Sequence, residues 1–119
     1  MKINEASTKI WSRIGSRATF GKSALELGDQ IDDLIILSGD TSTSAGLQRF
    51  KSTYPDKFID VGISEQNMIG IAAGLASEGN TVFTSTFAPF QTMRCCEQIK
   101  VNLGYMHHKV CLIYTSPSP

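Results

Sequence analysis

The sequence has no excess of charge, no long hydrophobic run and few cysteines. Its 119 residues include 11 basic and 11 acidic side chains, so the formal net charge is zero. No broad basic field is available to attract nucleic acid or anionic lipid. No apolar run approaches the roughly 20 residues that span a bilayer, and the N-terminal segment lacks the apolar core of a signal peptide. We therefore expect a soluble, cytoplasmic protein with no nucleic-acid or membrane partner.

The common motifs of metal, nucleotide and nucleophile sites are also missing. Cys95, Cys96 and Cys111 have neither the spacing of a zinc site nor an even number for a disulfide framework. Cys95 and Cys96 are adjacent, and we expect reduced thiols on neighbouring faces. Dinucleotide, P-loop, nucleophile-elbow and HExxH motifs are absent. We predict no metal site in this chain.

Hydrophobic periodicity indicates alternating helices and strands. Hydrophobic residues make up 41% and charged residues 18% of the chain, which is typical of one globular domain. The expected helices are residues 16–31, 41–54, 64–78 and 89–103, after an N-terminal arm or helix. The expected strands lie in DDLIILSGD (32–40), KFIDVG (57–62), TVFTSTF (81–87) and KVCLIY (109–114). This order predicts an α/β fold, an open parallel sheet with helices on both faces.

Three loops with reactive or polar side chains follow the first three predicted strands. They are residues 39–44, 62–65 and 85–90. Ligands of open parallel sheets bind at the carboxyl ends of the strands. We therefore expect the three loops to share one edge of the sheet and to form the functional site.

Glu65 is the chemically most interesting residue of these loops, and it has two interpretations. It follows Ser64, a potential helix cap, so it can simply be an acid stabilised by the helix dipole. Alternatively, the helix interior NMIGIAAGLA has almost no charged face and is predicted to be buried. A carboxylate at its start would then be partly desolvated, which is typical of acid–base groups.

The other two loops also allow a structural and a functional interpretation. Phe87 and Phe90 are either core aromatics or a wall that stacks on a flat heterocycle. Asp40 opens a row of hydroxyl residues that either caps a helix or offers hydroxyls to a phosphate. Arg17 is the nearest basic candidate in the sequence for that phosphate, but a lone arginine is usually solvated, and the pattern alone favours that role.

Residues 58–100, from FIDVG to CCEQIK, closely resemble the pyrimidine-binding domain of transketolases. The signature is the stretch from Gly62 to Gly74, followed by Thr86, Phe87 and Phe90. The resemblance extends from about residue 17 to 113 and is closest to the C-terminal subunit of split transketolases. It implies the thiamine-diphosphate-binding fold, with thiamine diphosphate as cofactor.

The resemblance also implies a role for each candidate residue. The residue matching Glu65 contacts N1′ of the aminopyrimidine ring and promotes the proton transfers that activate the cofactor. Residues matching Phe87 and Phe90 line the pyrimidine pocket, and the one matching Asp40 lies near the thiazolium ring.

A second pair of residues is implied to bind substrate. Residues matching Arg17 and Ser44 bind the phosphate end of the sugar, for which an arginine–phosphate contact is suitable chemistry.

The sequence departs from the family pattern in two places. The Gly-Asp-Gly…Asn motif that holds magnesium is absent, so Mg²⁺ and the diphosphate are expected on a partner chain. The chain also ends shortly after KVCLI, which suggests a truncated domain with an incomplete sheet, whose last edge is exposed or covered by a partner. The expected organisation is an arm or helix at 1–16, a partial pyrimidine-binding domain at 17–114 and a tail at 115–119.

The sequence thus predicts a transketolase-like component for two-carbon ketol transfer between sugar phosphates. Its expected partner is the diphosphate-binding subunit of a split transketolase, in a dimer or higher oligomer, and activity of the chain alone is not expected. One alternative is a non-catalytic fragment that only binds a partner subunit. The other is a domain of the deoxyxylulose-phosphate synthase or 2-oxo-acid dehydrogenase E1 β type, families that share this domain more loosely.

Overall fold

A four-stranded parallel sheet forms the centre of the structure, a computed structural model that describes residues 3–115. The strands are β1 (Leu34–Ser38), β2 (Phe58–Asp60), β3 (Thr81–Phe87) and β4 (Val110–Thr115). Their order in the sheet is β2-β1-β3-β4, and every neighbouring pair is parallel. The predicted open parallel sheet is confirmed.

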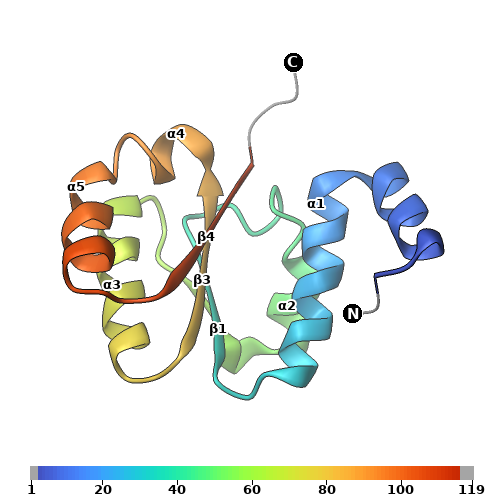
Figure 1. Cartoon of the computed structure of the whole chain (residues 1–119), viewed down its shortest axis with the longest axis horizontal. Coiled ribbons are helices and arrows are strands. Elements are labelled where there is room, and N and C mark those ends of the chain that lie inside the picture. Colours follow the sequence, from blue (N-terminus) through green and yellow to red (C-terminus); the bar gives the residue numbers. More distant parts are fainter. Residues whose placement is uncertain (1–2, 116–119) are drawn as a thin grey trace.

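Helices cover both faces of this sheet (Figure 1). They are α1 (Glu5–Gln30), α2 (Gln48–Thr53), α3 (Glu65–Ser77), α4 (Ala88–Gln91) and α5 (Cys96–Gln98), with a 3-10 turn η1 (Pro55–Lys57) and a π-helix η2 (Ile99–Tyr105). Helices α1 and α2 lie on one side of the sheet, and α3, α4 and α5 lie on the other. The α/β layering expected from the alternating pattern is therefore present.

The strand β1 supplies side chains to a separate apolar core on each face. Leu34 and Ile36 belong to the core under α1 and α2, whereas Leu37 belongs to the core under α3, because successive strand side chains point to opposite faces. The first core contains Ala24, Leu34, Ile36, Ala45, Leu47, Phe50 and Phe58, and the second contains Leu37, Met68, Ala72 and Val82. A central strand buried on both sides explains why DDLIIL is a continuous apolar run.

Helix α1 joins the predicted N-terminal segment and the first predicted helix. Asn4 caps its start, accepting a hydrogen bond from the Ser7 backbone N–H at 2.8 Å. Gly15 interrupts it with a positive φ of 79°, a conformation that glycine adopts without strain. The segment expected as an arm or helix up to residue 16 is therefore helical and separated by a kink. At the other end β4 reaches Thr115, and the rest of the predicted tail, 116–119, lies outside the described residues.

The predicted limits of two helices, 41–54 and 89–103, were wrong. The segment expected to be helical from residue 41 is a series of turns, and α2 begins only at Gln48. Thr41 bonds to the sheet instead, since it donates its backbone N–H to Ser38 Oγ and its hydroxyl to the Ser85 carbonyl. Side-chain bonds of this kind compete with helix formation.

The predicted helix 89–103 is divided into α4, α5 and η2. The buried Gln91 accepts a hydrogen bond from the Thr84 hydroxyl and donates one to the Ile113 carbonyl, which ties α4 to β3 and β4. Three residues later, the Arg94 carbonyl accepts a hydrogen bond from the Gln66 side chain on α3. The two anchors hold successive parts of the segment to different elements, which accounts for the interruption.

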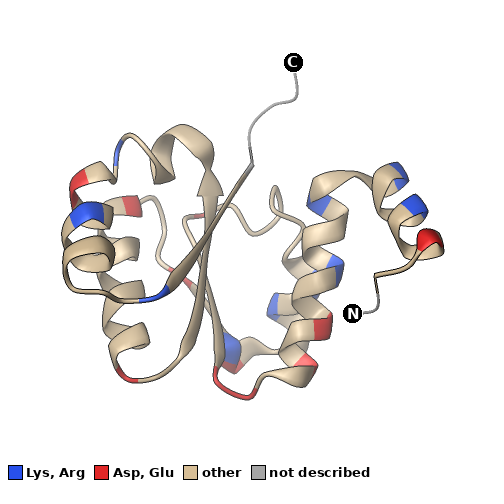
Figure 2. Ribbon diagram, in the orientation of Figure 1, with Lys and Arg blue, Asp and Glu red and all other residues tan. Residues whose placement is uncertain are grey.

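The four strands carry no Lys or Arg, and Asp60 at the end of β2 is their one acidic residue. Figure 2 shows Lys and Arg on the helices and connections and none on the strands. Among residues 3–115, no helix combines the length and the apolar content needed to cross a membrane. All three cysteines are free thiols; Cys95 is buried and its neighbour Cys96 is exposed.

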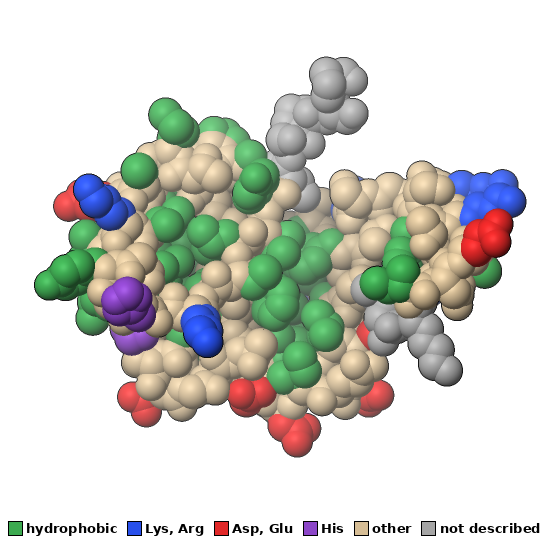
Figure 3. All heavy atoms as spheres, viewed as in Figure 1, with side chains coloured by type: hydrophobic (Ala, Val, Ile, Leu, Met, Phe, Trp, Pro, Cys, Tyr) green, Lys and Arg blue, Asp and Glu red, His purple; other side chains and the backbone are tan. Residues whose placement is uncertain are grey.

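The face turned to the viewer in Figure 3 carries an apolar area in its middle, beside the edge strand β4. Tyr114 of this strand is 54% exposed. β4 is an outer strand of the sheet, and an outer strand is able to pair with another chain or segment.

A close backbone contact between α1 and the loop after β1 depends on glycine. A Cβ added at Gly21 would overlap the Gly46 carbonyl oxygen, and one added at Gly46 would lie 2.8 Å from the Arg17 carbonyl oxygen. Gly46 also has a positive φ of 76°. These two glycines let the helix lie directly on the loop that leads to the sheet edge.

We predict that Gly21→Ala destabilises the chain, whereas Gly74→Ala on α3 does not. Overpacking a site of this kind costs about 1–3 kcal/mol, whereas alanine at an open helical position contributes up to about 1 kcal/mol. Nothing lies within 4 Å of a Cβ at Gly74, which makes it a matched control. Urea unfolding followed by circular dichroism measures both free energies, and equal midpoints for Gly21→Ala and the native chain would contradict the contact.

Candidate functional site

The three loops after β1, β2 and β3 meet in a small cavity of about 150 Å³. It is lined by Gly39, Asp40, Thr41, Ile63, Glu65, Thr86, Phe87 and Phe90. The segments predicted as loops, 39–44, 62–65 and 85–90, each contribute at least two of these residues, so their predicted convergence at one sheet edge is confirmed. In the last of them, Thr86 and Phe87 end β3 and Phe90 lies in α4. Four residues expected to face the cofactor, Asp40, Glu65, Phe87 and Phe90, are among those brought together.

Glu65 is the first residue of α3, and it is buried with 4% of its surface exposed. Ser64 occupies the cap position, but its hydroxyl donates to the Val61 carbonyl and caps no helix N–H. The Glu65 carboxylate accepts a hydrogen bond from Arg94 Nη1 at 3.2 Å. Glu65 is thus an acid at a helix start, as the helix-dipole interpretation required. It is also buried, as the acid–base interpretation required.

Phe87 and Phe90 form one wall of the cavity. Their ring centroids are 6.1 Å apart and their planes meet at 77°, an edge-to-face arrangement. Phe87 is 38% exposed, so in this chain it is not a core residue. A flat ring in the cavity would have aromatic surface beside it.

Thr86 adds a hydroxyl to the cavity that local sequence reasoning did not assign to the site. Its Oγ1 is buried and has no hydrogen-bond partner within the described residues. A buried hydroxyl without a partner costs free energy, so a ligand that bonds to it gains affinity. The available signal was a hydroxyl residue at a buried position of β3, next to the aromatic pair.

Asp40 is exposed and lies in the left-handed region with a φ of 57°. Asp60 fixes this turn, because its Oδ1 accepts the backbone N–H groups of Asp40 and Gly62, each at 3.0 Å. One carboxylate therefore ties the loop after β1 to the loop after β2. In the sequence Asp60 is the carboxylate that precedes Glu65 in the same stretch, and it was assigned no role in the site.

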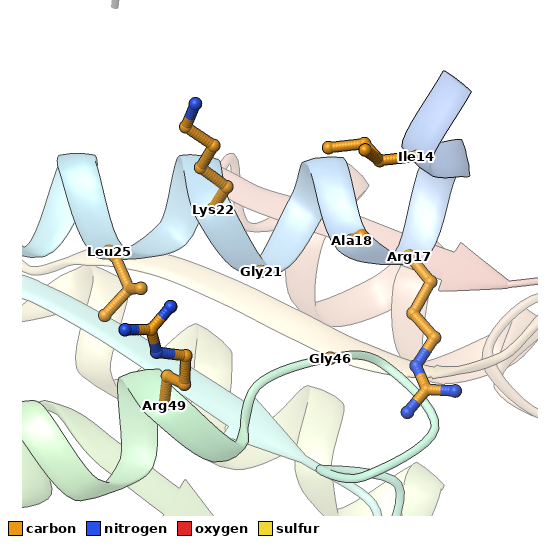
Figure 4. Close-up of a pocket in the computed structure, with 8 residues that line it drawn as sticks. All are labelled: Ile14, Arg17, Ala18, Gly21, Lys22, Leu25, Gly46 and Arg49. Carbon is orange, nitrogen blue, oxygen red and sulfur yellow. The ribbon is translucent and has the colours of Figure 1, made fainter. Parts of the chain in front are cut away.

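Arg17 and Ser44, the expected phosphate-binding pair, do not line the Glu65 cavity. Arg17 lies in a separate hollow of about 700 Å³ between α1, α2 and the loop that contains Gly46 (Figure 4). Its guanidinium group donates to the Thr43 carbonyl at 2.6 Å. Ser44 is exposed and does not appear in the lining of either cavity. Two further cations, Lys22 and Arg49, line the hollow with Arg17.

A second hollow, of about 330 Å³, also borders Glu65. It is lined by Ile63, Ser64, Glu65, Gln66, Asn67 and Arg94. Next to it, burial and, to a smaller extent, the Glu65 carboxylate raise the pKa of the Cys95 thiol, while Arg94 opposes this effect. The Cys95 thiol also donates to the Phe90 carbonyl at 3.1 Å. Cys95 is therefore a packed thiol rather than an activated nucleophile.

No cluster of three or more His, Cys, Asp or Glu side chains that could hold a metal ion occurs in residues 3–115. The side chains that line the cavity instead offer two carboxylates, two hydroxyls and two aromatic rings. Such a set is suited to a flat ring with polar edge atoms.

Comparison with known proteins identifies close relatives of this chain. Residues 12–118 match the family described as transketolase, pyrimidine binding domain. The putative transketolase C-terminal section of Methanocaldococcus jannaschii is 38% identical over 101 residues, which are 85% of this chain and 32% of that protein. Transketolase of Homo sapiens is 43% identical over 96 residues, which are 80% of this chain and 15% of that protein.

A solved structure extends the similarity to the fold. A split gene transketolase, described as an inactive β4 tetramer, superimposes with a TM-score of 0.76 at 35% sequence identity. The match covers 83% of this chain and 33% of that chain.

The chain spans about a third of the length of the Methanocaldococcus protein and of the split gene transketolase. It spans 15% of the length of human transketolase. The family match covers most of its residues and includes the cavity at the sheet edge. The chain therefore belongs to the transketolase pyrimidine-binding domain family.

Proposed function

We propose that this chain supplies the aminopyrimidine half of a thiamine diphosphate site in a transketolase-like assembly. The observation that carries the proposal is the cavity in which Glu65, Thr86, Phe87 and Phe90 converge. The reaction proposed for the assembly is transfer of a two-carbon ketol unit between sugar phosphates. Family membership supports the cofactor, because thiamine diphosphate is the cofactor of transketolases.

The residues of the cavity fit an aminopyrimidine ring. The faces of such a ring are apolar, and the wall of Phe87 and Phe90 offers aromatic surface for stacking or edge contacts. Its edge carries nitrogen acceptors and an amino donor. Glu65 and the unpartnered Thr86 hydroxyl are the polar groups available to that edge.

Thiamine diphosphate, when bound, supplies the carbon centre at which the two-carbon unit is held during transfer. The part of this chain is to hold the aminopyrimidine ring and to move a proton at its edge. Glu65 is placed for that task, because a carboxylate shielded from water exchanges a proton with a ring nitrogen more readily than a solvated one. Asp40, at the rim of the cavity, is proposed to lie toward the thiazolium ring.

The diphosphate and Mg²⁺ are proposed to be bound by a partner chain. The sequence has no Gly-Asp-Gly…Asn motif, and residues 3–115 contain no cluster that could hold a metal ion. Relatives that are named a C-terminal section and a transketolase subunit support a divided enzyme. The proposed assembly is therefore a dimer or higher oligomer with a diphosphate-binding subunit.

A non-catalytic role as a fragment that only binds a partner subunit is the second candidate. The observation that favours it is that Arg17 and Ser44 do not converge on the Glu65 cavity. A chain that keeps the fold but does not bind the substrate would have only one function, assembly with the partner subunit.

Glu65→Gln should abolish ketol transfer in the reconstituted assembly while the chain remains folded. General acid–base groups contribute about 10²- to 10⁴-fold to rate, so we expect a loss of at least about a hundredfold. Glu78→Gln, at the other end of the same helix, is the control and should retain the native rate. Enzyme assays with a diphosphate-binding partner, thiamine diphosphate and Mg²⁺ measure both variants.

The outcomes of this experiment separate the two candidate functions. If Glu65→Gln retains full activity, the role assigned to Glu65 is wrong. If the native chain with its partner neither binds the cofactor in calorimetry nor transfers a ketol group, the non-catalytic candidate is correct.

Arg17→Gln should weaken the use of phosphorylated acceptor sugars without changing the use of unphosphorylated ones. Loss of a hydrogen bond to a charged group costs about 1.5–3 kcal/mol, so KM should rise roughly ten- to a hundredfold. Lys22→Gln is the matched control, since it removes a neighbouring cation of the same hollow. An unchanged KM for the phosphorylated sugar in Arg17→Gln would exclude Arg17 from the substrate site.

A further inference from the structure

Arg94 is the cation that neutralises the buried Glu65 carboxylate. Its Nη1 lies 3.2 Å from Glu65 Oε2, and the two side chains are 46% and 5% exposed. A carboxylate this deeply buried is costly without a counter-charge or hydrogen bonds. Arg94 therefore supplies a counter-charge and a hydrogen bond to the proposed proton-transfer group.

Several contacts hold Arg94 in place. Its guanidinium carbon lies 4.0 Å from the centroid of the Phe90 ring, a cation–π contact. Its backbone N–H donates to the Pro89 carbonyl, and its own carbonyl accepts from the Gln66 side chain. The guanidinium group thus connects a side chain of the aromatic wall with the carboxylate of the same cavity.

The geometry leaves the second carboxylate oxygen available. Within the described residues the Glu65 side chain has its hydrogen bond through Oε2, and Oε1 has none. Glu65 lines both the 150 Å³ cavity and the 330 Å³ hollow, whereas Arg94 lines only the hollow. Arg94 therefore contacts Glu65 from the hollow, while its guanidinium group also lies against the Phe90 ring of the aromatic wall.

We propose that Arg94 is a positioning residue, which binds one oxygen of Glu65 and presents the other to an aminopyrimidine ring in the cavity. This inference rests on the proposed function of the cavity. Arg94 touches Glu65 and not the ring itself, so it acts through the carboxylate. Without it, Glu65 would lose both its counter-charge and the bond that orients it.

The test uses the full 119-residue chain and 4-amino-2-methylpyrimidine, a small aminopyrimidine that needs no partner subunit. Its affinity is measured from NMR chemical-shift changes. Arg94→Gln should bind it roughly tenfold more weakly, as expected for the loss of a charge-assisted hydrogen bond, and Arg94→Lys should recover part of this loss. Lys100→Gln, an exposed cation of η2, is the control and should bind as the native chain does.

A second readout follows the ion pair without a ligand. The guanidinium N–H signals of Arg94 should shift in Glu65→Gln and remain unchanged in Glu97→Gln, a nearby acid of α5. Thermal unfolding of the Arg94 variants establishes that they are folded. Guanidinium signals that are the same in Glu65→Gln and in the native chain would overturn the pairing on which the inference depends.

The outcomes for binding are distinct. Equal or tighter binding by a folded Arg94→Gln variant overturns the positioning role and leaves the proposed function standing. Failure of the native chain to bind the aminopyrimidine overturns the proposed function, and the positioning role with it.

Discussion

The parallel pairing of β1 with both of its neighbours is the constraint on which the site depends. Ser38, the last residue of β1, is in register with Asp60 of β2 and Ser85 of β3. The three strands run in the same direction, so the loops that follow them leave the sheet at one edge and at one level. Residues that are far apart in the chain, Asp40, Glu65 and Phe87, line the same cavity for this reason. An antiparallel strand in the middle would have sent one loop to the opposite end of the sheet.

Some polar groups at this edge have hydrogen-bond partners among the described residues and others do not. The groups without such partners indicate where a ligand would bind. Asp60 accepts hydrogen bonds from two backbone N–H groups and stabilises the turns after β1 and β2. Glu65 has a counter-charge in Arg94, but one of its oxygens has no hydrogen bond within residues 3–115. The Thr86 hydroxyl has no partner among those residues either. Buried polar groups in proteins are usually hydrogen-bonded, so the buried Thr86 hydroxyl marks a part of the cavity that a ligand would complete, and Glu65 lines the same cavity.

The fold and the convergence of the loops could be predicted from the sequence, whereas some helix limits and the roles of individual groups could not. Continuous apolar runs predicted the buried strands, and the apolar helix after Ser64 was predicted within one residue at each end. The helix expected from residue 41 failed because Thr41 bonds to Ser38 and Ser85. The helix expected over 89–103 is interrupted because Gln91 is anchored on β3 and β4. The bonds from Thr41 to Ser85 and from Gln91 to Ile113 span 44 and 22 residues, so local propensity carries no trace of them.

The sequence by itself determined the alternation of helices and strands, the edge at which the site forms and the residues Asp40, Glu65, Phe87 and Phe90 that line it. It could do so because side-chain periodicity and strand direction are local or topological properties. Only the tertiary structure decided that Arg94 neutralises Glu65, that Thr86 brings an unpartnered hydroxyl to the cavity and that Arg17 lies in a different hollow. Arg94 and Glu65 are 29 residues apart in the chain. Their contact exists because α3 and the segment between α4 and α5 pack against the same face of the sheet, and burial of the carboxylate there requires a nearby cation.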